Sequence, residues 1–294
     1  MATEVAQVMK NGQRQPSRWA PLFLLLHKRM AALGLVLCLV VVGTAILAPL
    51  IAPYDPLKIR TEIRLQLPSD QHWLGTDELG RDIFSRIVYG SRVSIAVGMI
   101  SICIALACGI PLGMFGAFYG KTVDTIIMRT MDALAAFPAI LLALAILSAM
   151  GPGIQNAMIA IGIVYMPAFS RNVRGSVLAV QENEYVLAAR ACGASDTYVM
   201  FKTILPNCLA PLLVHTSLGF ANAIITEAAL SFLGLGVQPP TPSWGAMLDE
   251  GRNYMDQTVW YSISAGMAIF LSVLGLNLVG DGLRDVLDPR LRGK

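Results

Sequence analysis

Long apolar stretches alternate with shorter polar ones along the chain. Most of the apolar stretches have about 20 residues, the length that a helix needs to cross the hydrocarbon core of a bilayer. The sequence therefore predicts an all-α polytopic membrane protein with six transmembrane helices, at about residues 32–52, 94–118, 133–150, 156–169, 209–235 and 260–279.

Proline and glycine interrupt three of these predicted spans. Pro138 and Pro167 predict kinks or helix starts in the third and fourth spans, because proline lacks the N–H that continues a helix. Gly116 and Gly120 lie four residues apart, a spacing that favours close packing against another helix. The polar residues 121–132 are expected to form an inner loop.

The polar stretches divide the chain into four parts. A cytoplasmic N-terminal segment covers residues 1–30 and is expected to include a short interfacial helix at 19–26. Residues 31–92 hold the first transmembrane helix and a long periplasmic loop, and 93–284 form the core transmembrane domain, which includes the 184–206 loop. Residues 285–294 are a basic cytoplasmic tail.

Two outer segments are predicted between the spans. The long first loop ends in an amphipathic helix, for which Thr76 or Asp77 is the expected N-cap. Residues 236–255 are rich in proline and glycine and are expected to be irregular.

One polar stretch, residues 184–206, lies between two apolar spans and is typical of two short helices with a break. Asn183 or Glu184 is expected to begin the first helix. Gly193 fits the left-handed residue that follows a helix. The first helix carries three small side chains, Ala188, Ala189 and Ala191. They would let another protein approach closely. The alternative interpretation is an ordinary amphipathic loop helix.

The second short helix has its own start and stop signals. Ser195 or Asp196 is expected to cap it, and Pro206 to end it. Its apolar stripe consists of Val199, Met200 and Ile204.

Composition supports the membrane assignment. The chain is 55% hydrophobic and 14% charged, with a mean hydropathy of +0.61, whereas soluble domains carry about 25% charged residues. The net charge of +3 is too small to indicate a nucleic-acid partner. Five cysteines and three histidines show no metal-ligand or catalytic spacing.

The lysines and arginines predict the orientation. With the N-terminus inside, fifteen of the twenty-two lie in inner segments and seven in outer ones. Basic residues prefer the cytoplasmic side. Both termini and the 184–206 loop are therefore expected in the cytoplasm.

The 184–206 loop resembles the EAA loop of the membrane subunits of ABC importers. The family pattern is E-A-A, three residues, G, nine residues and I-x-L-P; Leu187 replaces its Glu and Thr203 its Ile. The resemblance implies a coupling helix that docks on an ATPase. The implied contact residues are Glu184, Ala188, Ala189, Gly193, Ala194, Ser195, Leu205 and Pro206.

Residues 72–92, 230–248 and 277–293 resemble the second permease of the peptide/nickel uptake group. The resemblance implies a type I ABC importer permease fold in a bacterial inner membrane, surrounded by lipid. The implied partners are a homologous permease, two ABC ATPase subunits and a periplasmic or lipid-anchored binding protein that delivers peptide. ATP and Mg would be bound by the ATPases, with no cofactor and no catalysis in this chain.

The translocation path is expected to involve polar residues within the spans. An acidic residue in a span usually faces a cavity or a partner, and Glu227 is the example here, with a packing role as the alternative. The path candidates are Phe137, Met166, Asn222, Glu227 and Ser231.

The sequence is also compatible with other functions. The same architecture could import nickel, glutathione or another small solute. An ion-gradient-driven secondary transporter would require more intramembrane carboxylates and broken helices. A membrane-embedded enzyme and an uncoupled channel subunit are the remaining alternatives.

Overall fold

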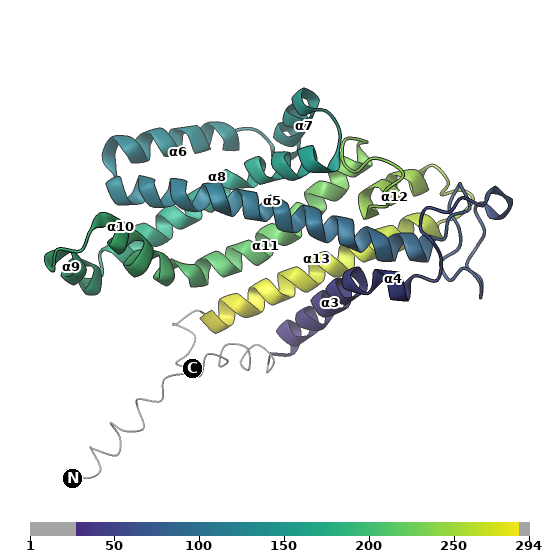
Figure 1. Cartoon of the computed structure of the whole chain (residues 1–294), viewed down its shortest axis with the longest axis horizontal. Coiled ribbons are helices and arrows are strands. Elements are labelled where there is room, and N and C mark those ends of the chain that lie inside the picture. Colours follow the sequence, from purple (N-terminus) through teal and green to yellow (C-terminus); the bar gives the residue numbers. More distant parts are fainter. Residues whose placement is uncertain (1–27, 288–294) are drawn as a thin grey trace, which may run out of the picture.

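The computed structural model describes residues 28–287, and their regular structure is helical apart from one isolated bridge. The expected interfacial helix at 19–26 and the end of the tail lie outside the described residues. Within this part of the chain, the helices of 18 residues or more run along the long axis of the molecule (Figure 1). They are α3 (Arg29–Ile46), α5 (Ile83–Tyr119), α8 (Ile154–Gln181), α11 (Leu205–Phe232) and α13 (Trp260–Leu287).

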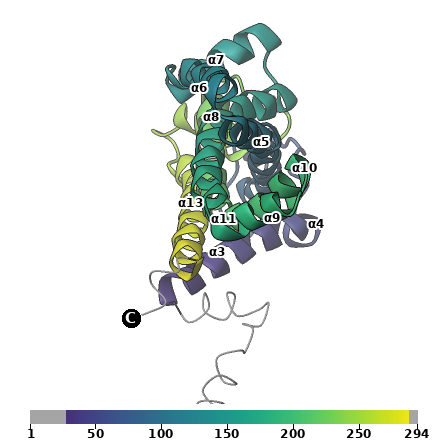
Figure 2. The same cartoon turned by 90° about the vertical axis from the view of Figure 1, so that its left-hand side faces the viewer.

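Shorter elements occupy the ends and one side of this bundle. They are α4 (Ala48–Ile51), η1 (Thr61–Ile63), α6 (Lys121–Ala135), α7 (Ala139–Met150), α9 (Glu184–Ala191), α10 (Asp196–Tyr198), η2 (Val199–Ile204) and α12 (Trp244–Arg252). Helices α9 and α10 lie at one end, and α12 lies at the other with the loop that precedes α5 (Figure 1). Helices α6 and α7 lie on the opposite side of the bundle from α3 (Figure 2).

The apolar core lies where α5, α8 and α11 meet. It includes Val97 and Ile102 of α5, Ile161 and Phe169 of α8, and Leu230 of α11. All five side chains are buried. The core therefore joins segments far apart in sequence and holds the long helices as one unit.

Four helical stretches of the described residues are long and apolar enough to cross a membrane. They are α3, α5, α13 and Asp196–Phe232, in which α10, η2 and α11 are continuous. Helices α6 and α7 make a fifth if this pair, bent by 91°, counts as one span. Because α8 does not meet the same test, the count of six spans stays a prediction.

Helix α5 begins later than the sequence pattern indicated. Its N-cap is Asp82, whose carboxylate accepts a hydrogen bond of 2.7 Å from the Ser85 N–H. The expected caps Thr76 and Asp77 lie in the preceding loop, where Asp77 pairs with Arg81. The amphipathic helix and the second span form one helix of 37 residues.

Two segments expected to be loops are helical. Residues 121–132 belong to α6, whose apolar residues recur with helical spacing at Val123, Ile127 and Met131. Asp124 of α6 accepts two hydrogen bonds of 2.6 Å from Arg174 of α8. The proline-rich segment at 236–255 contains α12, capped by the Ser243 hydroxyl, which accepts from the Ala246 N–H at 3.2 Å.

The predicted proline effects differ from site to site. Pro138 precedes α7 at the sharp bend after α6, which confirms a helix start there. Pro167 lies inside the continuous helix α8. Pro206 was expected to end a helix, but it lies in the first turn of α11, which continues from η2 without a break.

Glycines of α5 bring it close to α8, but not the pair singled out by spacing. A Cβ at Gly113 would lie 2.3 Å from the Ser170 carbonyl oxygen, and one at Gly109 would lie 2.9 Å from the Phe169 Cβ. Of the pair singled out by spacing, Gly116 packs against α6, where a Cβ would lie 3.2 Å from Asp124 Oδ1, and Gly120 ends α5 in open space with φ +59°. The close approach therefore depends on Gly109 and Gly113.

We expect Gly113→Ala to destabilise the protein, because the added methyl group meets rigid backbone and forces α5 and α8 apart. The cost should be about 1–3 kcal/mol. Gly43→Ala is the matched control, since a Cβ there has no neighbour within 4 Å. Thermal unfolding of the purified variants measures both, and equal melting temperatures would contradict this account of the packing.

A group of buried and partly buried charges fastens α5 to α12; we call it the outer charge cluster, because the sequence predicts that its segments lie outside the membrane. It consists of Asp77, Glu78, Arg81, Arg86 and Glu250. Arg81 Nε lies 2.5 Å from Asp77, and Arg86 Nη2 lies 3.0 Å from Glu250. Burial and the neighbouring Asp77 charge raise the pKa of the Glu78 carboxyl. Two arginines lie among the three carboxylates, so the arrangement is an ion-pair network.

Candidate functional site

The first helix of the 184–206 loop begins and ends as its sequence indicated. Asn183 is its N-cap, and α9 starts at Glu184. At the other end, the Gly193 N–H donates to the Arg190 carbonyl at 2.9 Å and the Ala194 N–H to the Ala189 carbonyl at 3.1 Å. These two bonds form a Schellman motif. Gly193 adopts φ +83°, the left-handed conformation expected there.

The second helix starts at its predicted cap and then continues into the bundle. The Ser195 hydroxyl accepts a hydrogen bond of 3.4 Å from the Tyr198 N–H. After α10 comes the π-helical turn η2, and α11 follows without a gap. The loop is thus joined directly to a long core helix, so a displacement of α10 would be transmitted to α11.

An apolar anchor holds the loop on the bundle. Val186 of α9 and Val199, Met200 and Ile204 of η2 are buried. They belong to one cluster with Val173 and Val177 of α8 and with Met114 of α5. The Arg190 guanidinium also lies 4.8 Å from the centre of the Phe118 ring of α5. Both short helices are therefore fixed to the long helices.

The same two short helices also expose four large apolar side chains. We call them the exposed loop face: Tyr185 (46% exposed), Leu187 (55%), Tyr198 (55%) and Phe201 (44%). Apolar patches of this kind, surrounded by polar residues, mark surfaces for protein partners. Helices α9 and α10, which carry Tyr185, Leu187 and Tyr198, lie at one end of the bundle (Figure 1).

The predicted contact residues lie around this face. Glu184, Ala188, Gly193, Ser195 and Pro206 are exposed, and Ala189, Ala194 and Leu205 are partly buried. A contact with an ATPase stays a prediction for all of them. The sequence reasoning missed Tyr185, Tyr198 and Phe201, and noted Leu187 only as a departure from a pattern. Large apolar residues in an otherwise polar loop were the signal that could have found them.

The path candidates do not share one environment. Phe137 is exposed at the bend between α6 and α7, and Asn222 is exposed on α11. Met166 of α8 is partly buried. Glu227 is fully buried and accepts hydrogen bonds from Ser231 at 2.8 Å and Ser94 at 3.3 Å. Their place in a path stays a prediction.

Two protein families match parts of this chain. A family model described as "binding-protein-dependent transport system inner membrane component" matches residues 109–293, and one described as "N-terminal TM domain of oligopeptide transport permease C" matches residues 23–68. The chain is 46% identical over 277 residues to a dipeptide transport system permease protein of Alkalihalophilus pseudofirmus, covering 94% of this chain and 91% of that one. It is also 46% identical to a glutathione transport system permease protein of Pectobacterium atrosepticum, covering 92% and 89%.

Solved structures share the fold. A chain of the MetNI methionine ABC transporter, in an inward-facing conformation, superimposes with a TM-score of 0.58 at 18% identity, covering 68% of this chain and 96% of that one. A chain of an amino acid ABC transporter gives a TM-score of 0.54 at 14% identity, covering 67% and 92%.

Proposed function

Because the chain belongs to the family of binding-protein-dependent transport system inner membrane components, we propose that it forms half of a path for di- and oligopeptides. It is a multi-pass inner membrane permease subunit of an ABC importer. The other half of the path is a homologous permease, and two ATPase subunits bind the ATP and Mg. A binding protein outside the membrane delivers the peptide.

The exposed loop face is the observation that carries the proposal. An anchored pair of short helices exposes four large apolar side chains. Burying a Leu or Phe side chain contributes about 1.5–3 kcal/mol, so this face can hold a partner firmly. A groove on the ATPase is the partner whose movement the loop would transmit.

The connection to α11 supplies the mechanical step. When ATP closes the ATPase pair, the loop follows the groove, and α11 moves with η2 because the two are continuous. Shifting the populations of two conformations from 1:99 to 99:1 requires a ligand that binds one conformation about 5.5 kcal/mol more tightly than the other. Nucleotide binding to the ATPases supplies this free energy, and the chain transmits it without catalysing a reaction.

Peptide is proposed as the substrate because dipeptide and di/tripeptide permeases of similar length resemble the chain at 46% identity. A glutathione permease is equally similar, and glutathione is itself a small peptide. Asn222 and Phe137, both exposed, are the candidates that can meet a substrate directly. Glu227 is buried and accepts hydrogen bonds from Ser94 of α5 and Ser231 of α11. Its proposed role is to hold α5 and α11 together.

We expect Leu187→Ser to weaken binding of the ATPase subunit about tenfold or more, since one exposed leucine contributes roughly 1.5–3 kcal/mol when a partner buries it. Ile59→Ser is the matched control, because Ile59 is 57% exposed in the periplasmic loop, away from the ATPase. The amount of ATPase that copurifies with the tagged permease measures both. Equal recovery from the two variants would contradict docking at this face.

Site-directed cross-linking tests the proposal itself. The Tyr198→Cys variant should cross-link to the ATPase subunit, and the yield should change when ATP is added. A cross-link to a different class of protein, or uptake that proceeds with the ATPase removed, would contradict the importer assignment and favour a gradient-driven transporter.

A further inference from the structure

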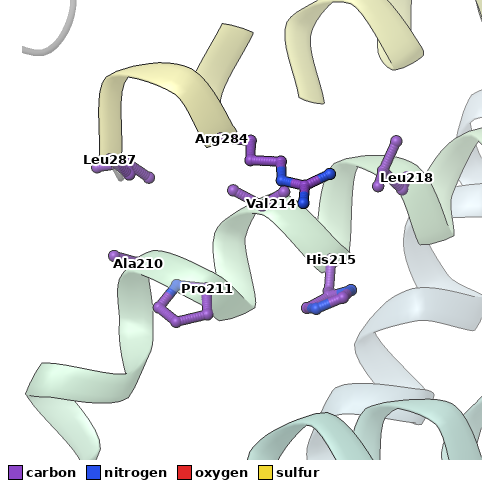
Figure 3. A pocket seen from close by; sticks show the side chains of 7 residues that line it. All are labelled: Ala210, Pro211, Val214, His215, Leu218, Arg284 and Leu287. Atoms are coloured by element: carbon purple, nitrogen blue, oxygen red, sulfur yellow. The ribbon is translucent and has the colours of Figure 1, made fainter. Parts of the chain in front are cut away.

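A cavity of about 390 Å³ lies between α11 and α13, apart from the 184–206 loop. Most of its lining is apolar, with one arginine and one histidine; the residues are Ala210, Pro211, Val214, His215, Leu218, Arg284 and Leu287. Figure 3 shows the Arg284 side chain extending from α13 towards α11, close to Val214. A cavity with an apolar wall and a cationic edge fits an amphipathic anion.

The cavity lies at the level of the inner membrane surface. Arg284 follows Trp260 by 24 residues within one helix, a rise of about 36 Å, whereas the hydrocarbon core is about 30 Å thick. Tryptophan is enriched at membrane interfaces. With Trp260 at the outer interface, Arg284 reaches the inner one.

The N-terminal end of α3 lies at the same level as Arg284. Lys28, next to the first residue of α3, pairs with Asp285 of α13 at 2.6 Å. Charged residues of two membrane helices thus meet beside the cavity. Phospholipid headgroups occupy this layer.

The arginine of the cavity is available for an anion. Among the described residues, Arg284 forms no ion pair within 4.0 Å and no hydrogen bond. Of the two carboxylates beside it on α13, Asp285 is engaged by Lys28, and Asp281 makes no ion pair within the described range. An unpaired guanidinium at the membrane surface attracts phosphate, with which it can form two parallel hydrogen bonds.

We propose that this cavity binds an anionic phospholipid of the inner leaflet. Its phosphate pairs with Arg284 beside His215, and an acyl chain follows the apolar wall formed by Pro211, Val214 and Leu218. The chain's own ends are poor occupants, because residues 1–27 and 288–294 each carry more basic than acidic residues and would repel Arg284. The bound lipid would fix the inner ends of α11 and α13 relative to each other.

Photo-cross-linking in the assembled transporter tests the site. The full complex, with a photoreactive amino acid at position 218, is reconstituted into vesicles of phosphatidylcholine and phosphatidylglycerol in equal amounts. We expect cross-links to phosphatidylglycerol to exceed those to phosphatidylcholine about fivefold, from roughly 1 kcal/mol per basic residue near the membrane surface. Arg284→Gln should abolish this preference.

Arg129→Gln is the matched control, because Arg129 is an exposed arginine of α6 that does not line the cavity. The preference should survive this change. If both variants lost the preference for phosphatidylglycerol equally, general surface charge would explain the preference, and the proposed site would be wrong. Cross-links to a subunit or to the chain's own ends would overturn it as well, as would displacement of the lipid by inorganic phosphate.

Discussion

Replacing Gly193 by tryptophan is expected to abolish ATP-driven uptake while leaving the transmembrane bundle folded. Gly193 has φ +83° and closes the Schellman motif between the two short helices. A side chain in this conformation costs about 1–2 kcal/mol. A Cβ at this position has no neighbour within 4 Å in this chain, so the indole ring would extend towards the ATPase and block docking.

Two milder substitutions separate strain from bulk. Gly193→Asn should keep most of the uptake, because asparagine tolerates the left-handed conformation. Gly193→Ala adds strain with little bulk and should lie between the two. Uptake of labelled dipeptide into vesicles containing the complete transporter gives the order. Equal activity of the tryptophan and asparagine variants would remove Gly193 from the contact.

The largest effect on stability is expected from Arg86→Met in the outer charge cluster. Arg86 is 1% exposed and contacts Asp77 at 3.4 Å and Glu250 at 3.0 Å. Its removal leaves three carboxylates around Arg81 alone. Removing one partner of a buried ion pair costs about 3–5 kcal/mol, because the remaining charge has been taken out of water without compensation.

Arg252→Met, at the end of α12, provides the comparison. Arg252 is 58% exposed and lies 3.6 Å from Asp249, and an exposed pair of this kind contributes about 0–1 kcal/mol. Melting temperatures of the two purified variants measure the difference. A small, similar decrease in both would show that the cluster is hydrated and does not fasten α5 to α12.

The turn chemistry of the 184–206 loop could be predicted because it depends on local rules. Gly193 was expected in the left-handed region from its place after a helix, and Ser195 or Asp196 was expected to cap α10, where Ser195 is the cap. Both features are fixed by one or two residues and their own backbone. Such signals survive in the folded protein, since no distant contact competes with them.

Other features depend on contacts that sequence reading does not provide. Residues 121–132 are polar enough to suggest a loop, but α6 is kept helical by its apolar stripe and by Asp124 with Arg174, 50 residues away. Asp77 was a plausible cap, yet Arg81 and Arg86 engage it in the loop. Pro206 was expected to end a helix. The helix continues through η2 because Ile204 packs into the buried cluster, and local sequence does not reveal this tertiary contact.

The exposed loop face could be predicted only in part from the sequence. Tyr185, Leu187, Tyr198 and Phe201 are visible in the sequence, but the side of the helix on which each lies depends on how Val186 and Met200 enter the core. The same limit applies to Glu227. Its burial against Ser94 of another helix could not be obtained from its position in an apolar stretch.

The ATPase activity of the complete transporter, reconstituted with its binding protein, tests the central claim most directly. The account predicts that binding protein loaded with a dipeptide stimulates ATP hydrolysis, and that Gly193→Trp in this chain removes the stimulation while basal hydrolysis by the ATPase subunits continues. Stimulation that is unchanged by Gly193→Trp would contradict coupling through the 184–206 loop.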